Sequence, residues 1–559
     1  MPRPWNFRQE ISKQGAKAVV TRLQAQPGPT LRVRAIFFEG NMKIKRGLAI
    51  VLALGFSLAA LGHADNTVSD STTSGDAPAA SAQSAGLGQR VADLEHRLAA
   101  LDSAAALQGA GAQFVTHPAG GIGFSNSDGT YGIQFGGTLQ EDSRNYIYDG
   151  LNSYNNGKDY ASVQPNEFVL ARARLLIDGI LGPRLHVRYQ EDFSNNGNNS
   201  GVLGSSGSTS GGNGAILVDA YGELKLFPWT LLRVGQFKAP LDIERGRPTP
   251  ALDFIQYSYT GGLVVDRAQG AALEISDPKQ IFYFSAGAYD GDTDAGSTPV
   301  VQAYNGDKDA IGKIFIQPFQ AIDGQALGDF GFGVSGSGGN HTWDPEAGFK
   351  SLGQLAVTNP AVGKVWASYT EGEGYRLIPQ AYWFWKNLSL LGEYVHESDG
   401  FRFTPGQATV GGHNASNAND TVESEAWSAQ ASWVVTGERT AYSGVKLNKD
   451  SFSWGALQLV ARAQGANYDE GAFTTYNAKG VELSQGLLDP LYSVKSLESW
   501  SVGVNYIPVS DLEFLVDWDQ TVFTDGGGAS IITAGKVTGE SVANRPTEQV
   551  LQARAQFAF

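Results

Sequence analysis

Basic side chains recur at alternate positions in one part of the sequence, a spacing that could build an anion-binding surface. Arg172 and Arg174 stand two residues apart in EFVLARARLLID, and Arg188 stands in LHVRYQEDF. Alternate residues of an extended strand point to the same face. A guanidinium binds phosphate or carboxylate through paired N–H donors. The candidate anion-binding residues are Arg172, Arg174, Arg188, Lys238, Arg245, Arg247 and Arg267.

These basic residues also have a structural interpretation, in which each one pairs with a nearby carboxylate. Acidic candidates for such pairs are Asp178, Asp192, Asp242 and Glu244. The formal net charge of −15 does not separate the two interpretations, because acidic residues in solvent-exposed loops contribute to the same total. Anion guidance and structural pairing therefore both remain open from the sequence.

One long connection, residues 239–268, carries more apolar and aromatic residues than a loop in water needs. It reads APLDIERGRPTPALDFIQYSYTGGLVVDRA. Folding inward against a wall would bury these side chains, and its prolines would stiffen the backbone. We expect this segment to narrow a passage and to set its selectivity. The predicted constriction residues are Phe254, Tyr257 and Tyr259.

Catalytic and metal-binding motifs are missing from the sequence. It contains no Walker A, no H-E-x-x-H and no G-x-S-x-G pattern. Cysteine is absent, which excludes disulfides and thiolate metal sites. Asp290, Asp292 and Asp294 have calcium-loop spacing, but Val301 stands where the closing glutamate belongs, so we interpret this segment as a solvated loop, with a weak calcium site as the alternative. We expect neither an enzyme nor a bound cofactor or metal.

Alternation with period two runs from about residue 131 to the end of the chain. A soluble β-sandwich also alternates, but an even number of strands with long and short connections in turn is typical of an outer-membrane barrel. A sheet that spans hydrocarbon must close on itself, because lipid offers no hydrogen-bond partners. The expected strands are 131–140, 167–178, 183–193, 215–226, 230–238, 269–276, 281–289, 311–319, 326–335, 374–385, 388–397, 424–436, 452–464, 497–507, 511–523 and 548–559.

The predicted fold class is therefore all-β, a 16-stranded antiparallel transmembrane β-barrel with an inward-folded third long loop, preceded by a short N-terminal helix or coiled coil. In EFVLARARLLID, we expect Val169, Ala173 and Leu175 on the outer face and the arginines on the inner face. The composition agrees, with 70 glycines and 11% aromatic residues. An acidic chain is also a poor binder of nucleic acid.

The N-terminal part of the chain reads as processing and linking segments. Met42 opens a basic, then apolar, run that ends in Gly62-His63-Ala64, which is typical of a secretory signal peptide, with a membrane anchor as the alternative. Leucine and valine at spacings of four and three predict a coiled coil or one packed amphipathic helix. The expected divisions are an upstream extension at 1–41, a signal peptide at 42–64, a disordered linker at 65–86, a coiled-coil helix at 87–107 and the barrel at 120–559.

The last expected strand, VLQARAQFAF, places Leu551, Phe557 and Phe559 on one face and ends on an aromatic residue. A terminal aromatic residue of this kind resembles the signal that the bacterial barrel-assembly machinery reads. The chain is therefore expected in the bacterial outer membrane, in contact with lipid.

The sequence resembles the phosphate-selective porin O/P family over roughly residues 120–559. The segments that carry the resemblance are EFVLARARLLIDG, DAYGELKLFPWTLLRVGQFKAPLDIE, LLGEYVHE and the terminal QFAF. The resemblance implies a homotrimeric, 16-stranded porin with an arginine-lined pore, whose third loop forms an anion site. The family carries Lys and Arg in the middle of that loop, whereas Gln256 and Tyr257 stand there in this chain.

Three hypotheses about function follow from the sequence. The first is a porin for passive diffusion of small anions, leaning to phosphate or related oxyanions. The second is a porin for neutral or organic solutes, with Phe254, Tyr257 and Tyr259 as a stacking surface. The third, an outer-membrane enzyme or adhesin, has no motif in its favour.

Overall fold

The computed structural model describes most of the chain from Gln113 onward. The described residues are 113–116, 121–149, 154–155, 158–159, 166–194, 215–290, 307–320, 326–345, 349–355, 357–358, 368–403, 419–447, 454–473, 475–477, 482–484, 488–527, 529–533 and 536–559. The expected upstream extension, signal peptide, linker and coiled-coil helix lie outside these residues. Among the described residues, no helix is long and apolar enough to span a membrane.

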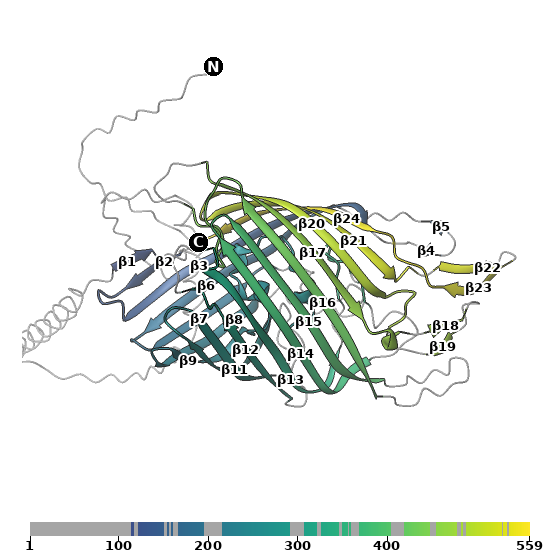
Figure 1. Ribbon diagram of the computed structural model, residues 1–559, viewed down its shortest axis with the longest axis horizontal. Helices are drawn as coiled ribbons and strands as arrows, with labels where there is room; N and C mark the ends of the chain where they lie inside the picture. The colour runs from purple at the N-terminus through teal and green to yellow at the C-terminus, as the bar shows by residue number, and fades with distance from the viewer. Residues whose placement is uncertain are drawn as a thin grey trace, which may run out of the picture. The chain divides into compact units, whose positions relative to one another are not determined.

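Sixteen strands in the described part of the chain form a closed antiparallel barrel, which confirms the predicted fold class (Figure 1). Each strand pairs with the next one along the chain, and the last pairs with the first, which closes the sheet. The strands are β3 (Tyr131–Asp149), β6 (Glu167–Leu181), β7 (Leu185–Asp192), β8 (Ile216–Phe227), β9 (Thr230–Lys238), β10 (Arg267–Ser276), β11 (Phe282–Asp290), β12 (Lys308–Ile316), β13 (Asp329–Pro345), β14 (Ser368–Trp385), β15 (Leu388–Phe403), β16 (Asn419–Val434), β17 (Ala456–Tyr468), β20 (Val494–Val509), β21 (Leu512–Asp525) and β24 (Glu548–Ala558).

Shorter strands lie outside the barrel wall proper. β2 (Ile122–Ser125) pairs with the beginning of β3, and β1 (Gln113–Thr116) pairs with β2. In the described residues of the long connections there are three small hairpins: β4 (Tyr154–Asn155) with β5 (Lys158–Asp159), β18 (Thr475–Tyr476) with β19 (Glu482–Ser484), and β22 (Ala529–Thr533) with β23 (Lys536–Ser541).

The connections differ in length at the two ends of the barrel. At one end, which we call the turn rim, β8 joins β9, β14 joins β15 and β20 joins β21 through two-residue turns. The longest connection at the turn rim is residues 435–455, between β16 and β17. The other end, the loop rim, carries long connections such as residues 239–266 between β9 and β10.

The hydropathy of the wall is the reverse of that of a water-soluble protein. In β17, Leu457 and Leu459 are exposed on the outer face, whereas Gln458 and Gln464 are buried on the inner face. The outer faces of the other strands carry exposed apolar and aromatic side chains in the same way, such as Trp433 in β16. The barrel is therefore apolar outside and polar within.

A β-bulge corrects one predicted face. Gln140 pairs with Arg172 and Glu141 pairs with Leu170, so that Ala171 is the extra residue. One extra residue exchanges the faces of everything beyond it. The prediction that Val169 shares the outer face with Ala173 is therefore wrong, since Val169 is buried and its neighbour Phe168 is 80% exposed.

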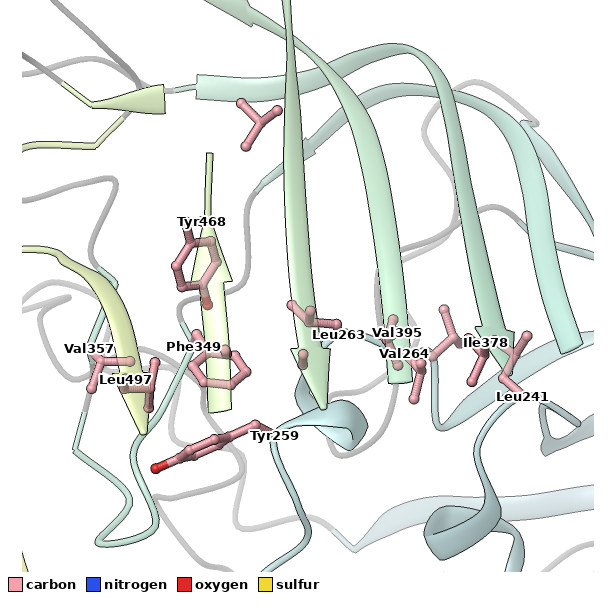
Figure 2. Close-up of a cluster of buried hydrophobic side chains, with 14 of the residues drawn as sticks. Leu241, Tyr259, Leu263, Val264, Phe349, Val357, Ile378, Val395, Tyr468 and Leu497 are labelled. Atoms are coloured by element: carbon pink, nitrogen blue, oxygen red, sulfur yellow. The ribbon is translucent and has the colours of Figure 1, made fainter. Parts of the chain in front are cut away.

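The largest cluster of buried apolar side chains lies inside the barrel, around the connection 239–266, which we call the inner loop. Figure 2 shows Leu241, Tyr259 and Leu263 of this loop beside wall residues such as Ile378 and Val395. The inner loop contains a single helical turn, α3 (Ile243–Gly246), and two short 3-10 turns, η1 (Thr249–Ala251) and η2 (Thr260–Gly262). Its apolar side chains thus find their burial in the barrel interior.

Candidate functional site

The inner loop is fixed to the barrel wall by hydrogen bonds from its backbone. The amide N–H of Ile243 donates to Glu393 Oε1 at 3.0 Å, and that of Ile255 donates to Asp517 Oδ2 at 2.7 Å. The amide of Tyr259 donates to Gln464 Oε1 at 2.9 Å. Carboxylates and amides of β15, β17 and β21 therefore satisfy backbone donors that would otherwise be buried without partners.

A segment from another long connection covers the inner loop. Phe349 packs its ring against Tyr259, with ring centroids 5.4 Å apart. Gln354 Nε2 donates to Gln256 Oε1 at 3.1 Å. Two donors of the same segment, Ser351 Oγ and the Gly353 amide, bond the carboxylate of Glu548 at 2.8 and 3.0 Å. Residues 349–355 thus hold the inner loop from a second direction.

Two of the three predicted constriction residues belong to the packed interior. Phe254 is 1% exposed, and the guanidinium carbon of Arg462 lies 4.2 Å from its ring centroid. Tyr259 is 2% exposed, and its hydroxyl lies 2.6 Å from Ser499 Oγ. Both residues anchor the loop, so neither offers a free ring to a solute.

Tyr257 is the remaining aromatic residue of the predicted set and is only partly buried. Its ring centroid lies 5.6 Å from the guanidinium carbon of Arg172 and 5.1 Å from that of Arg245. Distances of this size place both cations in favourable contact with the ring. The inner loop therefore presents a phenol between a guanidinium of β6 and one of its own.

Lys238 joins the same group from the end of β9. Its ammonium donates to the carbonyl oxygens of Arg245 and Arg247 at 2.6 and 2.8 Å. An ammonium has three N–H donors, and among the described residues the third has no acceptor. We call Arg172, Lys238, Arg245 and Tyr257 the Tyr257 site.

Arg172 differs from most of the predicted basic residues in having no carboxylate partner in the described part of the chain. Its Nη1 donates to the amide oxygen of Gln140 at 2.6 Å, and no described carboxylate lies within 4.0 Å. Its remaining N–H donors therefore have no acceptor among the described residues. Strand alternation indicated Arg172, and Lys238 was predicted from its place at the end of the long connection 239–268. The sequence did not indicate that neither residue has an acidic partner among the described residues.

The other predicted basic residues form ion pairs. Arg174 Nε lies 2.8 Å from Asp192, and Arg188 donates two hydrogen bonds to Asp178 at 2.7 and 2.8 Å. The remaining pairs are Arg245 with Asp266 at 3.4 Å, Arg247 with Asp253 at 3.0 Å, and Arg267 with Asp219 and Asp266 at 2.8 and 2.7 Å. The structural interpretation of the sequence thus accounts for Asp178 and Asp192.

Asp242 and Glu244 have other partners than the predicted ones. Asp242 Oδ1 accepts from the amide of Arg245 at 2.6 Å and caps α3. Glu244 accepts from the amide of Ser258 at 2.7 Å and lies 3.3 Å from Arg462. These acids organise the backbone of the inner loop.

Several arginines with structural roles were missed in the sequence, and Arg554 and Arg376 are two of them. Arg554 donates two hydrogen bonds to Asp142 at 2.6 and 2.8 Å, which joins the last barrel strand to the first. Arg376 Nε donates to the carbonyl oxygen of Leu263 at 2.8 Å and holds the end of the inner loop. Arg554 alternates with Gln552 and Gln556, so the pattern that indicated Arg172 could also have indicated it.

No protein-family model and no curated protein matches this chain. Among solved structures, the outer membrane channel DcaP of Acinetobacter baumannii is 12% identical, with 78% of this chain and 99% of that chain covered and a TM-score of 0.41. Outer-membrane expressed OmpT of Vibrio cholerae is 10% identical, with 80% and 100% covered and a TM-score of 0.40. The anion-selective porin from Comamonas acidovorans is 11% identical, with 76% and 99% covered and a TM-score of 0.39. Similarity at this level carries no conclusion about the function of this chain.

Proposed function

We propose that this chain is an outer-membrane porin that passes small anions by diffusion, favouring phosphate or related oxyanions. Its placement in a membrane is supported by the apolar outer face of a closed barrel. A Lys or Arg on a lipid-facing position costs roughly 2–4 kcal/mol at the bilayer midplane. Arg174 of β6 and Arg188 of β7, by contrast, point inward and pair with Asp192 and Asp178.

Exposed aromatic residues near the strand ends support the same placement. Trp229 lies in a turn at the turn rim and is 58% exposed, and Trp433 lies near the end of β16 at the same rim. Aromatic rings of this kind sit at membrane–water interfaces. The turn rim then faces the periplasm, since barrels of this class keep their short turns there.

The anion preference rests on one observation, the free donors of Arg172 and Lys238 beside Tyr257. A cation without a carboxylate partner contributes its full charge to the passage, whereas a paired cation is largely neutralised. In a narrow lumen the effective dielectric constant is lower than in bulk water, which strengthens its attraction for an anion. An oxyanion could accept hydrogen bonds from the guanidinium and the ammonium at once.

The hypothesis of neutral or organic solutes has less support from the inner loop. Of its three proposed stacking residues, Phe254 and Tyr259 are buried against the wall, and only Tyr257 is left. Liposome swelling with sugars would measure the permeation of neutral solutes.

Assembly as a homotrimer, and insertion through the barrel-assembly machinery, are further parts of the proposal that rest on the sequence resemblance.

Reversal potentials across a planar bilayer with a KCl gradient test the anion preference. We expect a reversal potential whose sign shows that chloride permeates more readily than potassium. We also expect added phosphate to reduce the chloride current by occupying the Tyr257 site. A reversal potential of the opposite sign would reject the anion preference and leave the barrel unaffected. An unchanged chloride current in phosphate would reject the oxyanion preference.

A further inference from the structure

The connection 435–455 is the longest one at the turn rim. Its residues 435–447, which we call the rim hairpin, carry an isolated antiparallel bridge between Arg439 and Lys446. Ala441 and Gly444 exchange backbone hydrogen bonds at 3.2 and 2.9 Å, which forms a tight tip. Gly444 has a φ of +97°, a conformation that favours glycine. A neighbouring turn also supports the hairpin, because the Thr440 amide donates to Lys386 O at 2.8 Å.

The tip of the rim hairpin contacts the inner loop from the turn-rim side. Tyr442 Oη donates to the carbonyl oxygen of Ile243 at 3.0 Å, and Arg247 Nε donates to the carbonyl oxygen of Tyr442 at 3.1 Å. The approach is close, since a Cβ added to Gly246 would lie 2.6 Å from Tyr442 Oη. The Tyr442 ring packs in a cluster with Ile243 and Phe384.

The contacted part of the inner loop is the part that orients the Tyr257 site. The carbonyl oxygens of Arg245 and Arg247 accept the two hydrogen bonds of Lys238. Tyr442 donates to the carbonyl of Ile243, and Arg245 and Arg247 follow this residue in the chain, before the turn at Thr249–Ala251. A shift of this arc would therefore move the acceptors of Lys238 and the guanidinium of Arg245 together.

We infer that Tyr442 is a positioning residue that holds the inner loop from the turn rim and so fixes the geometry of the Tyr257 site. The residue does not itself touch the free donors of Arg172. Its effect on selectivity rests on the proposed function, whereas its effect on the mobility of the inner loop does not. The two effects can be measured separately.

The mobility of the loop is measured with one introduced thiol. The chain has no cysteine, so Thr249→Cys, at a buried position of the contacted arc, gives a single labelling site. We measure the rate at which a small methanethiosulfonate reagent modifies the introduced thiol at position 249. The parent is Thr249→Cys by itself, and it is compared with Thr249→Cys combined with Tyr442→Ala, Tyr442→Phe or Ser443→Ala. Ser443 is exposed beside Tyr442 and serves as the matched control.

We expect Tyr442→Ala to accelerate labelling roughly tenfold or more, because the loop loses a hydrogen bond and aromatic packing. Tyr442→Phe should accelerate it by a smaller, several-fold factor, and Ser443→Ala should match the parent. A labelling rate for Tyr442→Ala equal to that of the parent would overturn the inference. Should Tyr442→Ala not form a barrel, Tyr442→Phe decides the matter by the same comparison.

The bilayer measurement then separates this inference from the proposed function. We expect Tyr442→Ala to lower the anion-to-potassium permeability ratio and to leave the heat-modifiable migration of a folded barrel intact. If Tyr442→Ala accelerates labelling but the parent channel shows no anion preference, the proposed function is rejected and the positioning role is supported. If the parent channel prefers anions but Tyr442→Ala labels at the parent's rate, the positioning role is rejected and the proposed function is supported.

Discussion

The ring of Tyr257 lies 5.6 Å from the guanidinium carbon of Arg172 and joins the inner loop to β6. This contact brings a cation without a described carboxylate partner to the least buried aromatic residue of the loop. A phenol ring and N–H donors without a described carboxylate partner thus lie together, and such donors suit an oxyanion.

Replacement of Arg172 by Ala should weaken anion preference without unfolding the barrel. The side chain has an amide partner, Gln140, and leaves no buried carboxylate behind. We expect the anion-to-potassium permeability ratio to fall about fivefold, since one unit charge a few ångströms away contributes on the order of 1 kcal/mol in water. Reversal potentials measure the ratio. Arg184→Ala, at an exposed turn position, removes the same charge and should have little effect; an equal effect of both variants would contradict the special role of Arg172.

Replacement of Arg174 by Ala should act mainly on stability. Asp192 would lose the partner that lies 2.8 Å away and would remain as a buried carboxylate. Loss of one member of a buried ion pair costs about 3–5 kcal/mol. We expect a lower urea midpoint of unfolding for Arg174→Ala and a partial recovery of the midpoint in the double variant Arg174→Ala with Asp192→Asn. The gel migration of the unheated barrel measures unfolding. If the double variant is no more stable than Arg174→Ala, the unpaired Asp192 is not the cause of the lost stability.

Anion preference should weaken as salt rises. The Debye length falls from about 10 Å at 0.1 M to about 3 Å at 1 M, so the charges of the Tyr257 site act over a shorter range. Reversal potentials at a fixed KCl ratio but rising total concentration measure the effect. A permeability ratio that stays constant over this range would indicate selection by size or by direct binding instead of by the field of these cations.

Phe559→Ala should reduce the yield of inserted barrel. The backbone of Phe559 exchanges hydrogen bonds with Gly137 at 2.9 and 3.1 Å, and a Cβ added to Gly137 would lie 2.9 Å from the Phe559 ring. The ring thus covers a position where only glycine fits. The heat-modifiable fraction in membranes measures insertion, with Phe557→Ala as the matched control on the same outer face. Equal yields for both variants would reject a special role of the terminal residue.

The barrel could be predicted because its determinants are local and repeat along the chain. The alternation of Arg172, Arg174 and Arg188 with apolar residues gave their inner face correctly. The error at Val169 came from a bulge, and nothing in EFVLARARLLID marks Ala171 as the extra residue. Strand ends were also underestimated, as in β13, which continues to Pro345.

The site depended on partners that are distant in the sequence. Arg172 and Arg174 are indistinguishable by spacing, and only the approach of Asp192 from β7 makes one of them a structural residue. Phe254 and Tyr257 are likewise similar in type, but Arg462 of β17 covers the first. The role of Tyr442 required the path of the rim hairpin, which no sequence pattern indicated.

The short strand β2 has a consequence for the dimensions of the barrel. It pairs with residues 132–135 of β3, on the edge along which β24 continues from Thr138 onward. A closing strand that slid by one register step toward the start of β3 would meet backbone groups that β2 already occupies. The pairing of β2 thus opposes a shift of the closing strand in this direction, and in a closed barrel shear and strand number together set the bore.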